Sequence, residues 1–279
     1  MVGGDGLAIV TGASSGLGLH TALGIARTGM RLVMVARDPA RTEAARKMVV
    51  ERAGTDRVEI ALADFASLAE IRGLADDLLA RCPRIDVLVN NAGLISPQFQ
   101  LSVDGYELTF AVNHLAPFLL TNLLLERIVS SAPARIVTVA SYAHRGATLD
   151  LATVARPPDW GSLRAYGRSK LCNILFTREL AARLEGKGVV ACCLHPGLVA
   201  TAIGQRGGFR ELAWRLAKPF MKGPEAGAAT SIFLATVADP TPFNGAYVVD
   251  KRVAAPDPTA LDAGLARGLW ELSARLVGL

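Results

Sequence analysis

The sequence predicts an α/β protein, a single doubly wound domain whose central, mostly parallel sheet of seven strands is flanked by helices. Three observations lead to this prediction. Short apolar runs alternate with longer segments of helical periodicity along the 279 residues. The strand-like runs are continuously apolar, which is typical of parallel strands buried on both faces. A glycine-rich turn also joins the first apolar run to the first helical segment, as in phosphate-binding folds.

The elements follow one another in the order that a parallel sheet requires. The expected strands are Leu7–Val10, Leu32–Ala36, Val58–Leu62, Asp86–Val89, Arg135–Ala140, Val189–Leu194 and Ala246–Val249. The expected helices are Leu17–Arg27, Thr42–Ala53, Ile71–Ala80, Tyr106–Ile128, Tyr166–Leu184 and Glu225–Ala238. Each helix can return the chain from the end of one strand to the start of the next. Because no linker, repeat or low-complexity stretch interrupts the series, we expect residues 1–279 to form one domain.

Two segments interrupt this alternation. Residues 143–161 have the composition of a loop and include Pro157 and Pro158. Residues 201–223 follow a predicted strand end and contain a glycine pair and a short amphipathic stretch. Ligands of open α/β sheets bind beyond the carboxyl ends of the strands. We therefore expect both segments to line a substrate site, with 201–223 acting as a lid.

Charge composition narrows the class of partners. Lys+Arg total 30 and Asp+Glu total 25, so the formal excess of +5 is mild for this length. The sequence contains no basic run and no stripe of aromatic residues among basic ones, so a nucleic-acid partner is not expected. We interpret the excess as solvated surface. Attraction of an anionic ligand is the alternative.

Cysteine usage and hydropathy bear on the compartment. The four cysteines form no Cys-x-x-Cys pair, and no cluster of side chains has metal-ligand spacing. We expect Cys192 and Cys193 to be buried strand residues, and we expect no disulfide framework and a reducing cytoplasm. The N-terminal residues lack the pattern of a signal peptide, and no uninterrupted apolar stretch reaches the roughly 18 residues of a membrane span. No integral membrane span and no metal site are therefore expected.

The turn from Thr11 to Gly18 has the composition of a phosphate cradle. Gly12 would permit a tight turn, Gly16 would let the backbone approach a pyrophosphate, and Gly18 would let the helix pack close to the strand. The start of the helix would then present free N–H groups to the phosphates. A purely structural turn is the alternative, but the turn lies between a strand and a helix, which is the context that phosphate binding requires.

The spacing Gly-x-x-x-Gly-x-Gly resembles the short-chain dehydrogenase/reductase family. Further motifs of that family follow in order, namely Asn90-Asn91-Ala92-Gly93, Asn113, Ser141, Tyr166-x-x-x-Lys170 and Pro196-Gly197. The resemblance covers nearly the whole chain. It implies a Rossmann-type fold and an NAD(P)-dependent oxidoreductase.

The resemblance also implies where a dinucleotide would bind. Its contacts would come from Gly12, Ser14, Ser15, Gly16, Leu17, Gly18, Arg37, Asp64, Asn90, Ala92, Gly93, Tyr166, Lys170, Pro196, Gly197 and Thr201. The family's acid that selects NAD usually ends the second strand, where this chain has Ala36, and Arg37 follows. Arg37 could pair with a 2′-phosphate, so we expect NADP(H). Asp38 next to it complicates this assignment, and the alternative is that Arg37 is an ordinary surface residue.

The proton-transfer residues are carried over from the same motifs. Tyr166 and Lys170 are four residues apart and share one face of a helix. A nearby ammonium favours the phenolate, so Tyr166 would act as the general acid or base. Ser141 would stabilise charge on the substrate oxygen, and Asn113 would anchor a water for proton relay. We interpret His114 and His195 as packed or capping side chains.

The segment from Tyr166 to Leu180 and the C-terminal Leu269–Leu279 resemble the retinol-dehydrogenase-like branch of the family. Many members of that branch carry an N-terminal membrane anchor, which this sequence does not show. We expect NADPH-dependent reduction of a ketone or aldehyde on a hydrophobic molecule, with alcohol oxidation as the reverse. Reduction of a C=C bond and a non-catalytic dinucleotide-binding protein are the alternatives. Because related helices often pair across subunits, we also expect a homodimer or homotetramer.

Overall fold

The computed structural model describes residues 4–197 and 223–279, and it confirms the α/β fold. One sheet has the strand order β3-β2-β1-β4-β5-β6-β7-β8. Its strands are β1 (Leu7–Thr11), β2 (Arg31–Ala36), β3 (Val58–Leu62), β4 (Val87–Asn90), β5 (Ala134–Val139), β6 (Val189–His195), β7 (Tyr247–Val249) and β8 (Arg252–Ala254). The pairs from β3 to β7 are parallel, as expected for β-α-β connections.

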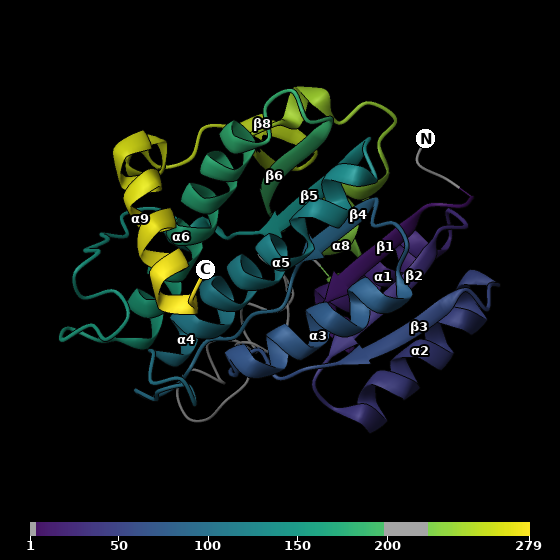
Figure 1. The fold of residues 1–279 in the computed structure, drawn as a ribbon, viewed down its shortest axis with the longest axis horizontal. Coiled ribbons are helices and arrows are strands. Elements are labelled where there is room, and N and C mark those ends of the chain that lie inside the picture. The colour runs from purple at the N-terminus through teal and green to yellow at the C-terminus, as the bar shows by residue number, and fades with distance from the viewer. Residues whose placement is uncertain (1–3, 198–222) are drawn as a thin grey trace.

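Helices cover both faces of the sheet (Figure 1). The main helices are α1 (Gly16–Ala26), α2 (Pro39–Ala53), α3 (Leu68–Arg81), α4 (Leu108–Phe110), α5 (Ala116–Ser130), α6 (Ser162–Arg183), α8 (Pro224–Thr236) and α9 (Ala263–Val277). Helices α1, α2 and α8 form one layer, and α3, α5 and α6 form the other. Helix α9 packs outside α5 and α6 as an additional layer.

Strand β1 is the point at which the order of the strands changes direction: β2 and β3 lie on one side of it, and the strands from β4 onward lie on the other. Strand β1 pairs with β2 on one side and with β4 on the other, both in parallel. The segments that leave the carboxyl ends of β1 and β4 therefore emerge next to each other. This is the topological switch point at which open α/β sheets bind their ligands.

The strand count differs from the prediction, because the described part of the chain forms a sheet of eight strands rather than seven. Strand β8 pairs antiparallel with β7 through a two-residue turn at Asp250 and Lys251, both with positive φ. Such turns usually contain Asn or Gly. Their absence here left the hairpin without its usual sequence signal.

Three helical features also differ from the expected boundaries. The segment expected as one helix from Tyr106 is divided into α4, a π-helical turn at Ala111–Leu115 and α5. Helix α6 begins at Ser162, four residues before Tyr166. Helix α9 was not among the expected helices, although Asp262 caps its start and Gly278 ends it in the left-handed conformation.

One helical stretch, Leu108–Ser130, is long and apolar enough to cross a membrane by length and composition. In this fold 78% of its most apolar window is buried, as in the core helix of a globular protein. The four cysteines are buried and free, and the burial of Cys192 and Cys193 in β6 confirms the prediction for these two. The lid predicted at 201–223 lies outside the described residues except for Gly223, which precedes α8.

Candidate active site

The glycine turn after β1 lies against the segment that leaves β4. Gly12 has φ +67°, and a Cβ placed on it would lie 2.9 Å from the Cα of Ala92. A Cβ on Gly18 would lie 2.3 Å from the carbonyl oxygen of Gly12 and 2.4 Å from Nδ2 of Asn91. No side chain fits at either position, so both glycines are required for this close approach.

Thr11 and Asn91 join the two segments. The hydroxyl of Thr11 accepts hydrogen bonds from the backbone N–H groups of Asn91 and Ala92, both at 3.0 Å. The side-chain amide of Asn91 donates to the carbonyl oxygen of Thr11 at 2.7 Å. Neither residue was assigned a role from the sequence, although Asn91 lies inside the Asn90–Gly93 motif. The structure gives them the task of holding the glycine turn in place.

The start of α1 offers an uncapped helix terminus. Ser15 occupies the N-cap position without a side-chain hydrogen bond, and the first turn contains no acidic residue. Leu17 is buried against Val139 and Ala228, which fixes the direction of the helix. Free N–H groups and the helix dipole together favour an anion at this position. The residues present therefore fit the phosphates of a dinucleotide.

Arg37 and Asp64 lie together at the ends of β2 and β3. The two side chains form an ion pair with 3.3 Å between Nη1 and Oδ2, and the Arg37 side chain is 72% exposed. Asp38 accepts a hydrogen bond from the backbone N–H of Arg41 at 2.9 Å and caps α2. This helix-capping contact accounts for an acidic residue beside Arg37.

Tyr166 and Lys170 lie on the same face of α6, as their spacing predicts. The Lys170 ammonium lies 5.6 Å from the centre of the Tyr166 ring and donates to the carbonyl oxygen of Val139 at 2.8 Å. Burial lowers the pKa of Lys170 to about 8. Burial also raises the pKa of Tyr166, and a hydrogen bond with Ser141 acts in the opposite direction.

Ser141 follows the end of β5 and begins a short 3-10 turn, Tyr142–His144. Its hydroxyl accepts from the backbone N–H of Ala143 at 3.2 Å. The same hydroxyl contacts the phenol of Tyr166. The structure thus brings the predicted serine and tyrosine together from two separate elements.

Asn113 lies in the π-helical turn between α4 and α5, a type of distortion that is frequent at functional sites. Its Oδ1 accepts from the backbone N–H of Leu94 at 2.8 Å, and its Nδ2 donates to Ser169 Oγ at 3.0 Å. A Cβ placed on Gly93 would lie 3.1 Å from Asn113 Oδ1 and 3.6 Å from Lys170 Nζ. Asn113 and Lys170 therefore face the same small space beside Gly93.

Three further residues of the predicted site are described by the structure, and a fourth is not. The buried Asn90 side chain donates to Thr121 Oγ1 at 2.9 Å, on the α5 side of β4. Pro196 and Gly197 follow β6 directly. Thr201 lies outside the described residues.

The two histidines are packed, as interpreted from the sequence. His114 is buried, with Nε2 2.8 Å from Ser273 Oγ on α9, and burial lowers its pKa to about 3. The Nδ1 atom of His195 accepts from the backbone N–H of Tyr142 at 3.2 Å. Within residues 4–197 and 223–279 no group of three or more His, Cys, Asp or Glu side chains has the arrangement of a metal site.

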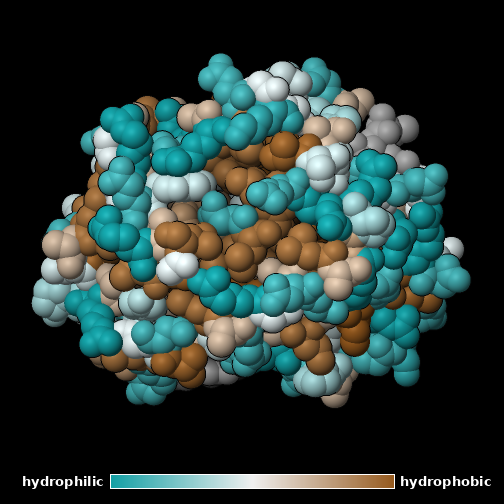
Figure 2. All heavy atoms as spheres, viewed as in Figure 1, coloured by the Kyte–Doolittle hydropathy of each residue, from teal (hydrophilic) through white to brown (hydrophobic). Residues whose placement is uncertain are grey.

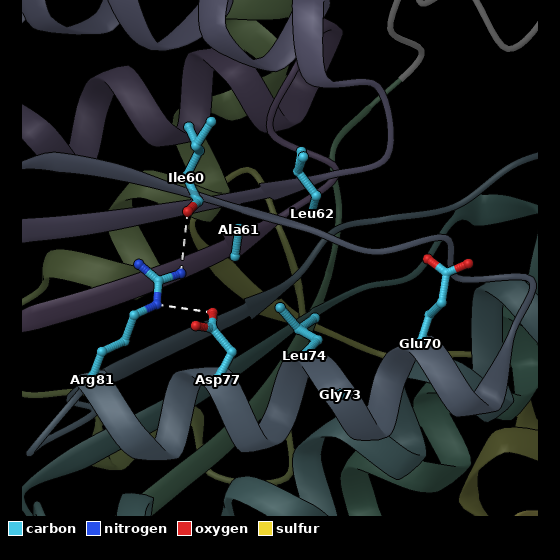
Figure 3. A pocket seen from close by; sticks show the side chains of 8 residues that line it. All are labelled: Ile60, Ala61, Leu62, Glu70, Gly73, Leu74, Asp77 and Arg81. Carbon is cyan, nitrogen blue, oxygen red and sulfur yellow. Dashed lines mark hydrogen bonds and ion pairs between the residues drawn. The ribbon is translucent and has the colours of Figure 1, made fainter.

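Two surface hollows are lined by none of the four predicted catalytic side chains. A groove of about 630 Å³ runs between β3 and α3 and includes Arg81, which bonds to Asp77 and to the carbonyl oxygen of Ile60 (Figure 3). A second hollow of about 560 Å³ lies between the 143–148 segment and the start of α6. Arg145, Arg164 and Asp159 line it, so it is polar rather than apolar. Neither hollow contains a residue assigned to the cofactor or to catalysis.

Comparison with known proteins gives extensive matches. Residues 6–208 match the profile of the short chain dehydrogenase family. Retinol dehydrogenase 14 of Mus musculus is 40% identical over 289 residues, covering 97% of this chain and 85% of that protein. Dehydrogenase/reductase SDR family member 13 of Bos taurus is 42% identical over 277 residues, covering 98% and 73%.

Solved structures match over similar lengths. An uncharacterized protein of Mycobacterium paratuberculosis superposes with a TM-score of 0.80 at 32% identity, covering 99% of this chain and 94% of that one. A Beutenbergia cavernae protein assigned as an NAD(P)-dependent gluconate 5-dehydrogenase, with NADP bound at low occupancy, gives a TM-score of 0.72 at 28% identity. That match covers 89% of this chain and 95% of the other.

Proposed function

Because the chain belongs to the short chain dehydrogenase family and to its retinol-dehydrogenase-like branch, we propose that it is an NADPH-dependent oxidoreductase. It would reduce a ketone or aldehyde of a hydrophobic small molecule to an alcohol, reversibly. The observation that carries this proposal is the convergence of Ser141, Tyr166, Lys170 and Asn113 beside the open start of α1. The Beutenbergia structure with bound NADP supports the choice of cofactor class.

The residues that would hold the dinucleotide follow from the site geometry. The glycine turn and the N–H groups at the start of α1 would bind its phosphates. Arg37 would contact a 2′-phosphate, and Asp64 would lie near the adenine end. The nicotinamide end would lie near Gly93, which adjoins Asn113 and Lys170. Bound there, the reduced cofactor supplies the hydride for the carbonyl carbon.

The side chains of the candidate site would transfer a proton to the substrate oxygen. A raised pKa keeps the Tyr166 phenol protonated at neutral pH, so that it can donate to the substrate oxygen. Lys170, with a pKa of about 8, is charged at pH 7 and stabilises the phenolate that remains. The Ser141 hydroxyl would hydrogen-bond the same substrate oxygen. Asn113 would hold a water through which Lys170 passes a proton.

The hydrophobic substrate class is supported by the loops that leave β4 and β5. Phe99 on the first loop is 47% exposed, and its ring meets Trp160 on the second loop edge-on with 6.0 Å between centroids. Trp160 Nε1 donates to the buried Glu107 at 3.1 Å, which fixes the second loop on the first.

Free, buried cysteines suit the reducing cytoplasm that we propose as the compartment.

The test is an NADPH-consumption screen over aliphatic, aromatic and terpenoid aldehydes and ketones, with identification of the products. We expect turnover of at least one hydrophobic carbonyl by the parent and a loss of about a thousandfold or more in Tyr166→Phe, because the phenol proton is removed. Cofactor binding by fluorescence should remain in Tyr166→Phe. A variant with parental rate would refute the role of Tyr166.

An enone substrate distinguishes the alternatives. An allylic alcohol as product supports carbonyl reduction, whereas a saturated ketone supports reduction of the C=C bond. Binding of NADPH without turnover of any compound in the screen would favour a non-catalytic dinucleotide-binding protein.

A further inference from the structure

The turn that follows β5 holds Ser141 through a buried histidine, His144. Its ring packs edge-on against Tyr247 on β7, with 5.0 Å between the ring centroids. Its Nδ1 lies 2.6 Å from the carbonyl oxygen of Ser141, and its Nε2 lies 3.0 Å from the backbone nitrogen of Asp257. The side chain therefore joins the backbone of Ser141 to the segment that follows β8.

The two partners determine which nitrogen of His144 carries the proton. A carbonyl oxygen only accepts, so Nδ1 must donate to Ser141. A backbone N–H only donates, so Nε2 must be unprotonated to accept from Asp257. A doubly protonated ring would direct an N–H at the N–H of Asp257 and lose that bond. The ring can make both bonds only in its neutral Nδ1–H form.

Charged groups around His144 are consistent with a neutral ring. Burial is the main cause that lowers its pKa, and the neighbouring Arg145 adds to this. The hydrogen bond to Ser141 and the Asp257 carboxylate act in the opposite direction, more weakly in sum. Tyr247, packed against the ring, carries no charge at neutral pH, since the ordinary pKa of a phenol is about 10 and burial raises the pKa of Tyr247 further.

Two further contacts join the turn that follows β5 to the segment that follows β8. The backbone N–H of Gly146 donates to Asp257 Oδ2 at 3.1 Å, and Arg145 donates to the carbonyl oxygen of Ala255 at 2.8 Å. On the opposite side, a Cβ on Gly167 would lie 2.6 Å from the carbonyl oxygen of Ala143. Gly167 follows Tyr166, so the turn is packed directly against the helix that carries the tyrosine.

We infer that His144 is a positioning residue for Ser141, setting the serine hydroxyl against Tyr166 by bridging the Ser141 carbonyl and the Asp257 N–H. The inference rests on the proposed function, in which Ser141 binds the substrate oxygen. A histidine that merely fills the core would be replaced by any ring of similar size. A positioning histidine needs the donor at Nδ1.

Three substitutions separate the two bonds. His144→Phe keeps a ring against Tyr247 and removes both bonds. His144→Asn keeps a donor near the position of Nδ1 but does not reach Asp257. His144→Gln places its amide near the position of Nε2, toward Asp257, and has no donor at the position of Nδ1. Val49→Ala, in the core on the other sheet face, is the control for general loss of stability.

The measurements are kcat, KM for the carbonyl substrate found in the screen, KM for NADPH and the melting temperature. We expect kcat of His144→Phe to fall by about 10–100-fold with KM for NADPH unchanged, because a small displacement of a catalytic group has this effect. His144→Asn should recover part of the loss, because it keeps the bond to Ser141 without the bridge to Asp257, and His144→Gln should recover none. Val49→Ala should lower the melting temperature and leave kcat near the parental value.

Parental kcat in a folded His144→Phe protein would overturn the inference. If that variant does not fold, the Asn and Gln variants decide it, since equal kcat values for the two would overturn it as well.

A readout without turnover separates this inference from the proposed function. Nitrogen-15 NMR of the parent at pH 7 should show a neutral His144 with a slowly exchanging Nδ1 proton. The other tautomer, or a charged ring, in an active protein would overturn the inference alone. The expected tautomer in a protein that reduces no carbonyl would refute the proposed function, and the role of His144 in it.

Discussion

Arg37 and Asp64 were assigned separately to the cofactor, and the structure shows them paired with each other. The pair is largely exposed and 3.3 Å long, so it contributes little to stability. It does hold the guanidinium at the end of β2, where a 2′-phosphate could replace Asp64 as its partner. The predicted preference for NADPH therefore depends on one side chain that is free to change its partner.

Arg37→Glu should reverse this preference. We expect the parent to bind NADPH about 10–100-fold more tightly than NADH, since a charge-assisted hydrogen bond contributes about 1.5–3 kcal/mol. The variant should bind NADH more tightly, because a carboxylate repels the phosphate and accepts from a ribose hydroxyl. Fluorescence titration measures both affinities. Arg52→Glu, the same charge change at the far end of α2, should leave the preference for NADPH over NADH unchanged. Equal affinities of the parent for NADPH and NADH would refute the role of Arg37.

At the scale of elements, the glycine turn depends on how closely α1 approaches β1. Gly18→Ala places a methyl group against backbone atoms of Gly12, which cannot move without opening the turn. We expect a lower melting temperature and a loss of NADPH affinity. Gly73→Ala in α3 is the matched control, because nothing lies within 4 Å of its Cβ position. Gly73→Ala should stabilise the protein by up to about 1 kcal/mol through helix propensity. If Gly18→Ala likewise keeps its melting temperature and NADPH affinity, the packing argument is contradicted.

Helix α9 is joined to the π-helical turn that carries Asn113 by the His114–Ser273 contact. His114 stacks on Phe110 with 5.2 Å between centroids, while Trp270 of α9 lies 4.9 Å from Phe118. The π-helical turn that carries Asn113 is thus held against an apolar cluster of aromatic rings. The neutral form of His114 is favoured there, because burial among apolar rings disfavours a charged ring more strongly than the hydrogen bond with Asn173 favours it.

This buried histidine predicts how stability depends on pH. Because burial lowers the folded-state pKa of His114 to about 3, the unfolded chain binds a proton below its own value of about 6.5 that the folded chain does not. Stability should fall as pH drops from about 6.5 toward 3, by at most about 1.4 kcal/mol per pH unit from this residue. Urea unfolding at pH 7.5 and 5.0 measures the fall. The loss of unfolding free energy between the two pH values should be smaller in His114→Gln than in the parent, and Val49→Ala should show the same loss as the parent. An unchanged loss in His114→Gln would refute the assignment of this pH dependence to His114.

At the scale of the whole molecule, the face formed by α3, α5 and α9 bears on association. Figure 2 shows apolar side chains gathered across the middle of this face, over α5 and between α9 and α3. The α5 residues Leu125 and Val129 are only partly buried and are four apart, so they share the outward side of the helix. Helix α9 covers much of α6, which leaves α5 as the surface for the predicted pairing of subunits.

We therefore expect a homodimer that associates through α5. Light scattering should give about twice the chain mass of 29.4 kDa. Leu125→Glu should shift the mass toward one chain, because a charge replaces an apolar contact. Val253→Glu on the edge strand β8, where the valine is 59% exposed, should leave the mass unchanged. A parental protein of single-chain mass would refute the prediction of a dimer or tetramer.

Much of the molecule follows from short-range patterns. Apolar runs predicted β1 to β7 because most of these strands are buried on both faces, the edge strand β3 being the exception. The Tyr166–Lys170 spacing alone predicted a shared helix face. The hairpin to β8 was missed because its turn at Asp250 and Lys251 uses neither Asn nor Gly. Helix α9 had capping residues at both ends, but it follows no β-α-β unit and so lay outside the expected alternation.

The sequence by itself determined the fold class, the order of the elements and the residue types of the candidate site, because hydrophobic periodicity and motif spacing are local properties of the chain. Only the tertiary structure decided how those residues are held. The clamp of Thr11 and Asn91, the ion pair of Arg37 with Asp64 and the bridge from Ser141 through His144 to Asp257 each join residues distant in sequence. Such contacts depend on the strand order that brings separate segments to one edge of the sheet, and no local pattern records it.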